Sequence, residues 1–169
     1  MQDPTYFNLG DHTEAVQIDF DPKVLSFAKL LDTFWGTENS CAGSDSRQYM
    51  SAVFFHDGTQ KKLAYETRAR ETKTKRAPLA AAILPLNRFY VAEDYHQKYF
   101  LRQQDELMQE FRAMYPDARD FMNSTAAARV NGYLGGSGSE TALRKALPAL
   151  GLSPESSRRL LELCKHSEP

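Results

Sequence analysis

Residues 14–20 limit the choice of fold most strongly, because apolar and polar side chains alternate there. Val16, Ile18 and Phe20 fall on one side of an extended chain, which is the pattern of a half-buried strand. A Gly-Asp turn signal precedes the run, so Glu14 is expected where a loop enters the strand. A carboxyl group buried at that junction keeps its proton more readily and becomes a candidate proton donor. A solvated strand-end carboxylate is the more common alternative.

Further apolar runs with turn or capping signals continue the alternation of strands and helices. Residues 131–139 (NGYLGGSGS) lack phosphate-loop spacing and are predicted to form a substrate-covering loop. The other predicted elements are a helix from Phe27 to Gly36 capped by Ser26, a loop at 37–47, a strand at 48–56, a helix at 60–75, a strand at 79–86, a helix from 92 to about 114, and helices at 141–150 and 154–165, the last capped by Ser153. The order predicts an α/β fold.

Composition excludes several classes of protein. The 169 residues are 41% hydrophobic and carry a net charge of -1, which favours a globular domain without a general attraction to nucleic acid. No apolar run approaches the roughly 20 residues that span a bilayer. Cys41 and Cys164 lie far apart, so we expect no disulfide framework, no metal site and a reducing, intracellular compartment. The cytoplasm is the default, with a mitochondrion or other organelle left open.

Two aromatic positions are candidates for chemistry. Tyr49 begins the second predicted strand, where its hydroxyl either contacts a ligand or simply meets water. His96 lies between Tyr95 and Tyr99, and a histidine in such a place is more often a fixed hydrogen-bonding residue than a catalyst.

Several blocks of sequence, in order, resemble the A-type peptide methionine sulfoxide reductases. They are PTY at 4–6, HTEAVQIDFDP at 12–22, FAKLLDTFW at 27–35, QYMSA at 48–52, FYVAEDYHQKY at 89–99 and NGYLGG at 131–136. The resemblance implies an α+β plait, a ferredoxin-like two-layer mixed sheet with flanking helices. It also implies a family domain at 1–139 and a helical C-terminal extension at 140–169.

The resemblance implies reduction of oxidised methionine in proteins or peptides. A cysteine thiolate attacks the sulfoxide sulfur, the departing oxygen is protonated, and a second thiol resolves the sulfenic acid. By the match, Glu14 is the general acid, and Tyr6 and Tyr49 donate to the sulfoxide oxygen. His12, Glu93 and Asp94 are implied supporting residues. No bound cofactor is implied, only an external thiol reductant such as thioredoxin.

The sequence departs from the family pattern at the nucleophile. The family motif Gly-Cys-Phe-Trp-Gly is absent, so we expect the first strand and helix of the domain to be missing and activity of this chain to be in doubt. Cys41 is a weak substitute nucleophile, because only Arg47 is near enough in sequence to lower its pKa. Asp45 replaces the family's loop aspartate only if that loop shifts.

At the C-terminal loop, Leu134 stands where a resolving cysteine often lies, which leaves Cys164 as a weak candidate for that role. Three functions remain open: a reductase sequence recorded without its start, a non-catalytic relative that binds oxidised or Met-rich peptides or regulates a full-length relative, and an interaction domain whose pocket has decayed.

Overall fold

The computed structural model describes residues 4–5, 8, 10–37, 46–75 and 78–165. The chain forms two compact units, residues 1–91 and 92–169, and each is described by itself. The predicted limits of the family domain, 1–139 and 140–169, concern sequence relationship and stay a prediction. No helix among the described residues is both long enough and apolar enough to cross a bilayer.

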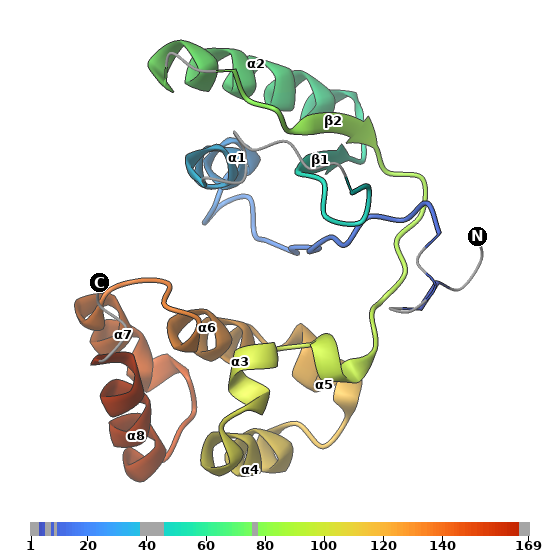
Figure 1. Ribbon diagram of the computed structural model, residues 1–169. Helices are drawn as coiled ribbons and strands as arrows, with labels where there is room; N and C mark the ends of the chain where they lie inside the picture. The colour runs from blue at the N-terminus through green and yellow to red at the C-terminus, as the bar shows by residue number, and fades with distance from the viewer. Residues whose placement is uncertain (1–3, 6–7, 9, 38–45, 76–77, 166–169) are drawn as a thin grey trace. The chain divides into compact units, whose positions relative to one another are not determined.

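The first unit is a small βαβ arrangement with one further helix. It contains α1 (Phe27–Gly36), β1 (Ala52–Phe55), α2 (Gly58–Lys75) and β2 (Ala82–Pro85). The two strands are parallel, with Ala52 opposite Ala82 and Phe55 opposite Pro85. Because parallel strands need a long crossover, α2 connects them, and it lies along both strands (Figure 1).

The core of this unit lies between α1, α2 and the strands. Trp35 is fully buried, and its indole Nε1 donates to Thr67 Oγ1 on α2 over 2.9 Å. Ser26 caps α1 by accepting from the Lys29 backbone N–H, as the sequence predicts. The buried residues that share this core are Leu31, Trp35, Val53, Ala64, Leu79, Ala81 and Ile83.

The strand predicted at residues 14–20 is not formed, and this expectation is wrong. Residues 12–20 belong to no helix or strand, and Val16 and Ile18 are 87% and 56% exposed. An alternating pattern makes a strand only when a neighbouring edge completes the hydrogen-bond ladder. Among the described residues, the only backbone–backbone hydrogen bond made by residues 14–20 runs from the Glu14 N–H to the Gln48 carbonyl, at 2.9 Å.

The mixed α/β class is therefore confirmed, but the described residues do not show a plait. Their sheet has two short strands, and most of the regular structure is helical. The strands expected at 48–56 and 79–86 are shorter than predicted, since only residues 52–55 and 82–85 pair with each other. An extended backbone is stabilised only where its N–H and C=O groups pair with a neighbouring strand.

The second unit is helical. Its elements are η2 (Asp94–His96), α3 (Tyr99–Arg102), α4 (Asp105–Met114), α5 (Ala118–Asn123), α6 (Thr125–Leu134), α7 (Glu140–Ala146), η3 (Leu147–Ala149) and α8 (Pro154–Lys165). Helices α3, α5 and α8 pack on α6, and α7 packs on α8 (Figure 1). The buried apolar core includes Leu101, Leu107, Phe111, Val130, Leu143, Leu150 and Leu160.

Two predictions about this unit are corrected. The single helix expected from 92 to about 114 is divided, because Lys98 adopts a left-handed backbone with φ 55° and Gln104 is also non-helical. The predicted flexible loop at 131–139 begins later, because Asn131 to Leu134 complete α6. Burial of Val130 and a bond from the Leu101 N–H to Asn131 Oδ1 (3.3 Å) hold that last turn.

A carboxylate on α4 holds the start of α8. Glu110 Oε2 accepts from the Ser153 backbone N–H at 3.0 Å, and Oε1 accepts from Ser156 Oγ at 2.8 Å. Ser153 Oγ in turn accepts from the Ser156 N–H at 3.1 Å, as its predicted capping role requires. Partial burial alone raises the pKa of Glu110, but the hydrogen bonds from Ser153 and Ser156 outweigh it and lower the pKa.

Glu110→Gln is expected to lower the free energy of unfolding by about 1–2 kcal/mol at pH 7, because an amide NH₂ then faces a donor. A carboxyl group with a lowered pKa stabilises the fold above its ordinary value of 4.5, and this stabilisation is lost as the pH falls through the folded-state pKa. Urea unfolding at pH 7 and pH 3 checks both effects. The control Glu106→Gln on the same helix removes a carboxylate that is 76% exposed and should cost about half as much or less. A difference between wild type and Glu110→Gln that did not shrink at pH 3 would contradict the account.

Candidate functional site

The side chain of Gln48 joins two of the predicted site residues. Its Nε2 donates to Glu14 Oε1 at 2.7 Å and to the Tyr49 hydroxyl at 3.0 Å. The Glu14 backbone N–H donates to the Gln48 carbonyl, which fixes the two segments side by side. Gln48 is half-buried, while Glu14 and Tyr49 are exposed, Tyr49 by 57%. The amide therefore holds a carboxyl group and a phenol within reach of the same small ligand.

Further contacts attach residues 11–14 to the segment that enters β1. Thr13 Oγ1 donates to the Arg47 carbonyl at 3.0 Å, and Arg47 Nε donates to the Asp11 carbonyl at 2.7 Å. These bonds join residues 34 and 36 positions apart in the sequence. Glu14 is thus positioned by several bonds, although it belongs to no strand.

His12 lies beside this arrangement and packs on an aromatic ring. Its imidazole meets Tyr90 edge to face, with ring centroids 5.2 Å apart. Its Nε2 is 4.0 Å from Asp11 Oδ1, and the side chain is only 24% exposed. The Tyr90 hydroxyl accepts from Arg88 Nη1 at 3.0 Å. His12 therefore connects residues 11–14 to the segment that follows β2.

Sequence reasoning missed the structural parts played by Gln48 and Tyr90. Both lie inside blocks that carry the family resemblance, Gln48 directly before Tyr49 and Tyr90 in the FYVAEDYHQKY stretch. The position of these two residues within those blocks was the sequence feature that could have singled them out. Neither residue is part of an acid–base or thiol pattern that would single it out by chemistry.

The structure does not describe three other predicted residues, and two more lie in the second unit. Tyr6, Cys41 and Asp45 lie outside the described residues. Glu93 and Asp94 belong to the second unit, where the backbone carbonyls of Glu93 and Asp94 accept from the N–H groups of His96 and Gln97. There they shape the short η2 turn.

Cys164 is half-buried on α8 and adjoins the glycine-rich segment after α6. The hollow beside it is about 20 Å³, which is space for about one water molecule. Burial raises the pKa of the Cys164 thiol. Less of it is therefore thiolate at neutral pH, which makes it a poor attacking group.

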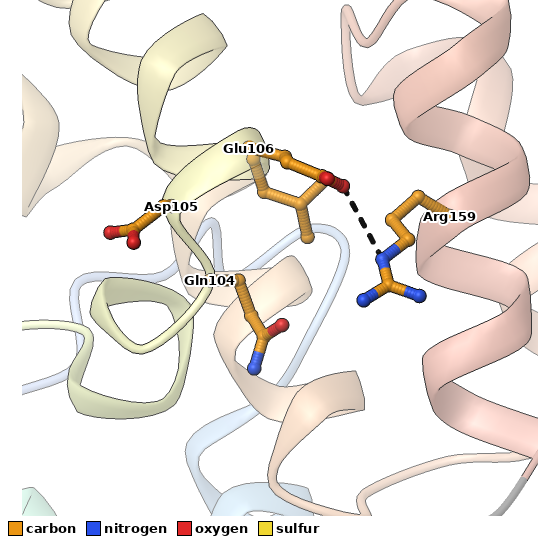
Figure 2. A pocket seen from close by; sticks show the side chains of 5 residues that line it. Gln104, Asp105, Glu106 and Arg159 are labelled. Carbon is orange, nitrogen blue, oxygen red and sulfur yellow. Dashed lines mark ion pairs between the residues drawn. The ribbon is translucent and has the colours of Figure 1, made fainter.

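The second unit also has a polar hollow of about 170 Å³ between the start of α4 and α8 (Figure 2). An ion pair of 3.4 Å between Glu106 Oε2 and Arg159 Nε crosses it. Gln104, Asp105 and Leu107 complete its lining, and none of the lining residues is a predicted site residue. Among the described residues, no group of three or more histidine, cysteine, aspartate or glutamate side chains could hold a metal ion.

Comparison with known proteins matches the chain to reductases. The family model described as peptide methionine sulfoxide reductase matches residues 1–140. The chain is 37% identical over 154 residues to a peptide methionine sulfoxide reductase of Drosophila melanogaster, covering 89% of this chain and 61% of that protein. It is 33% identical over 136 residues to peptide methionine sulfoxide reductase A5 of Oryza sativa, covering 77% and 53%.

A third relative is the peptide methionine sulfoxide reductase MsrA of Methanosarcina acetivorans, 41% identical over 111 residues and covering 59% of each chain. The chain thus spans between 53% and 61% of the length of these three curated relatives. The family model covers well over half of the 169 residues, including both segments that Gln48 joins. The chain therefore belongs to the peptide methionine sulfoxide reductase family.

Proposed function

We propose that this chain takes part in reducing methionine sulfoxide in oxidised proteins, with Glu14 as proton donor and Tyr49 and Tyr6 as donors to the sulfoxide oxygen. The observation that carries the proposal is the Gln48 amide, which contacts both Glu14 and Tyr49. A departing sulfoxide oxygen gains negative charge, so hydrogen-bond donors and an acid at that oxygen lower the barrier.

The hydrogen bonds of Gln48 also suggest which atoms act. Gln48 donates to Oε1 of Glu14, so Oε2 is the oxygen that carries the transferable proton in this proposal. The Tyr49 oxygen accepts from Gln48, and its own O–H is the proposed donor to the substrate. Glu14 is exposed, and a bound peptide would cover it.

The remaining predicted residues take supporting roles in the proposal. His12 packs on Tyr90 and steadies the segment before Glu14. Asp45, Glu93 and Asp94 are supporting residues by family match alone.

The thiol chemistry is assigned to the two cysteines of the chain and an external dithiol. The thiolate attacks the sulfoxide sulfur, and the oxygen, once protonated, passes from the methionine sulfur to the cysteine sulfur; this releases methionine and leaves a sulfenic acid on the cysteine. A second thiol displaces that oxygen as water and forms a disulfide, which a thioredoxin-type dithiol reduces. Cys41 is the weak substitute for the attacking thiol, and Cys164, whose pKa is raised by burial, is the weak candidate for the resolving one.

Turnover of a methionine-S-sulfoxide peptide with excess dithiothreitol tests this assignment. Reduction by the wild-type chain that is lost in Cys41→Ser would make Cys41 the attacking thiol, and Glu14→Gln should then lower the rate about 10²-fold or more. Cys164→Ser is the matched thiol control and should retain turnover, because dithiothreitol resolves a sulfenic acid directly. Turnover unchanged by Cys41→Ser would contradict the assignment of the nucleophile.

A second candidate function is recognition of oxidised or methionine-rich peptides without reduction, or regulation of a full-length relative through such binding. The half-burial of Cys164 favours it, because burial raises the pKa of this thiol and makes one of the two thiols poorly suited to attack. Absence of turnover together with retained binding of the sulfoxide peptide would select this function over the first.

A further inference from the structure

Arg47 is held beside the candidate site but keeps one end of its guanidinium group open. Its Nε donates to the Asp11 carbonyl at 2.7 Å, and its own carbonyl accepts from Thr13 Oγ1 at 3.0 Å. In the part of the chain that the structure describes, neither terminal Nη atom of Arg47 makes a hydrogen bond or an ion pair. The residue is exposed, so these two donors are accessible to a ligand.

This open end distinguishes Arg47 from the other described arginines of the first unit. Each of those three uses an Nη atom within the chain: Arg68 bonds to the Ala81 carbonyl, Arg70 pairs with Asp32, and Arg88 bonds to the Tyr90 hydroxyl. Their guanidinium groups therefore have structural partners. Arg47 is fixed through Nε alone, which leaves its pair of Nη groups for a molecule from outside.

The open Nη pair lies close to the groups proposed to act on the sulfoxide. Two peptide bonds separate Arg47 from Tyr49, so their Cα atoms are at most about 7.6 Å apart. Glu14 is held from the residue between them, because Gln48 Nε2 donates to its Oε1 at 2.7 Å. An extended peptide advances about 3.3–3.6 Å per residue. A peptide with its sulfoxide at Tyr49 therefore reaches Arg47 with a residue one or two positions away.

A carboxylate is the ligand that fits these two donors. Its oxygens match the parallel N–H groups of a guanidinium, and such charge-assisted bonds are about twice as strong as neutral ones. Glu14 and Asp11 are exposed on the same surface, the Asp11 side chain by 74%. Their carboxylates oppose an approaching anion at longer range, so an acid gains affinity only in direct contact with Arg47.

We propose that Arg47 is a specificity-determining residue, which binds the side-chain carboxylate of an aspartate or glutamate within two positions of the oxidised methionine. The inference rests on the proposed function, because Glu14 and Tyr49 set where the sulfoxide lies. It names the preferred substrates as protein segments in which an oxidised methionine has an acidic neighbour.

The test measures binding of fluorescent peptides to the full chain by anisotropy. Each peptide is acetylated and amidated, contains one methionine sulfoxide, and has at most one side-chain carboxylate. Two peptides place an aspartate two positions before or two positions after the sulfoxide, and the proposal requires a gain from one of them. That peptide should bind about fivefold more tightly than its asparagine counterpart, and the ratio should shrink at high salt. An aspartate six positions away should give no gain.

Variants of the chain show whether Arg47 is the source of this preference. Arg47→Gln should bind the aspartate and asparagine peptides equally, and Arg47→Lys should keep a smaller preference of about twofold, because a lysine offers a point charge without the paired donors. Lys62→Gln is the control for loss of one positive charge, since Lys62 is 75% exposed on α2 and pairs with Glu66. It should keep the fivefold ratio.

The ratio of the two affinities separates recognition from a structural role. If Arg47 only steadied residues 11–14, Arg47→Gln would weaken both peptides alike and leave the ratio unchanged, which would overturn the inference. Equal binding of the aspartate and asparagine peptides by the wild type would also overturn it. Loss of preference for sulfoxide over methionine, with the aspartate preference intact, would instead contradict the proposed function and leave the carboxylate site standing.

Discussion

Trp35→Ala is expected to lower the free energy of unfolding by about 3–5 kcal/mol, a large part of the 5–15 kcal/mol typical of a folded domain. Trp35 is completely buried, meets Phe34 edge to face at 4.9 Å, and donates to Thr67 Oγ1. Its loss opens a cavity between α1 and α2 in the unit that carries Gln48. β1 begins at residue 52, four residues after Gln48. We therefore expect loss of this core to disrupt the site as well.

Circular dichroism during urea unfolding measures this effect, since the chain has no second tryptophan for fluorescence. Phe34→Ala at the neighbouring, half-buried position is the matched control and should cost clearly less. Trp35→Phe should fall between them, because the Thr67 hydroxyl still donates to the Leu63 carbonyl. A cost below about 1 kcal/mol for Trp35→Ala would contradict the packing described for this unit.

Phe111→Ala is expected to destabilise the second unit by a similar amount, about 3–5 kcal/mol. Phe111 is completely buried on α4, stacks on Tyr115 and meets Phe121 edge to face, with both ring centroids 6.2 Å away. Truncation removes the ring that both aromatic neighbours contact. The expected result is a lower midpoint of unfolding for the helical unit in urea.

Phe100→Ala tests whether position rather than residue type decides the cost. Phe100 is 47% exposed on α3, so its truncation should cost about 1 kcal/mol or less. Similar costs for the two phenylalanine variants would show that Phe111 does not anchor the core.

Local signals predicted the helices best. Ser26 and Ser153 cap α1 and α8 as their sequence positions indicate, because a cap needs only residues within the next turn. The strand predicted at 14–20 is wrong, because an alternating sequence does not show whether a neighbouring strand is present to pair with it. The break at Lys98 was missed for a related reason: the left-handed backbone there has no glycine or proline to signal it.

The candidate site shows the same limit. Glu14 and Tyr49 were singled out from their places at predicted strand ends and from the family blocks. Their connection through Gln48 depends on contacts between segments 34 residues apart, which no local pattern reveals. The positions of Tyr6, Cys41 and Asp45 remain predictions, because these residues lie outside the described structure.

The most direct test of the central claim is a comparison of one peptide with methionine and with methionine sulfoxide, titrated into the wild-type chain and into Tyr49→Phe and Glu14→Ala. Isothermal titration calorimetry gives both affinities for each protein. We expect the wild type to prefer the sulfoxide about tenfold, and each variant to lose most of that preference while binding the methionine peptide as before. A wild-type chain without preference, or variants that keep it, would contradict recognition of the sulfoxide oxygen by the cluster that Gln48 holds together.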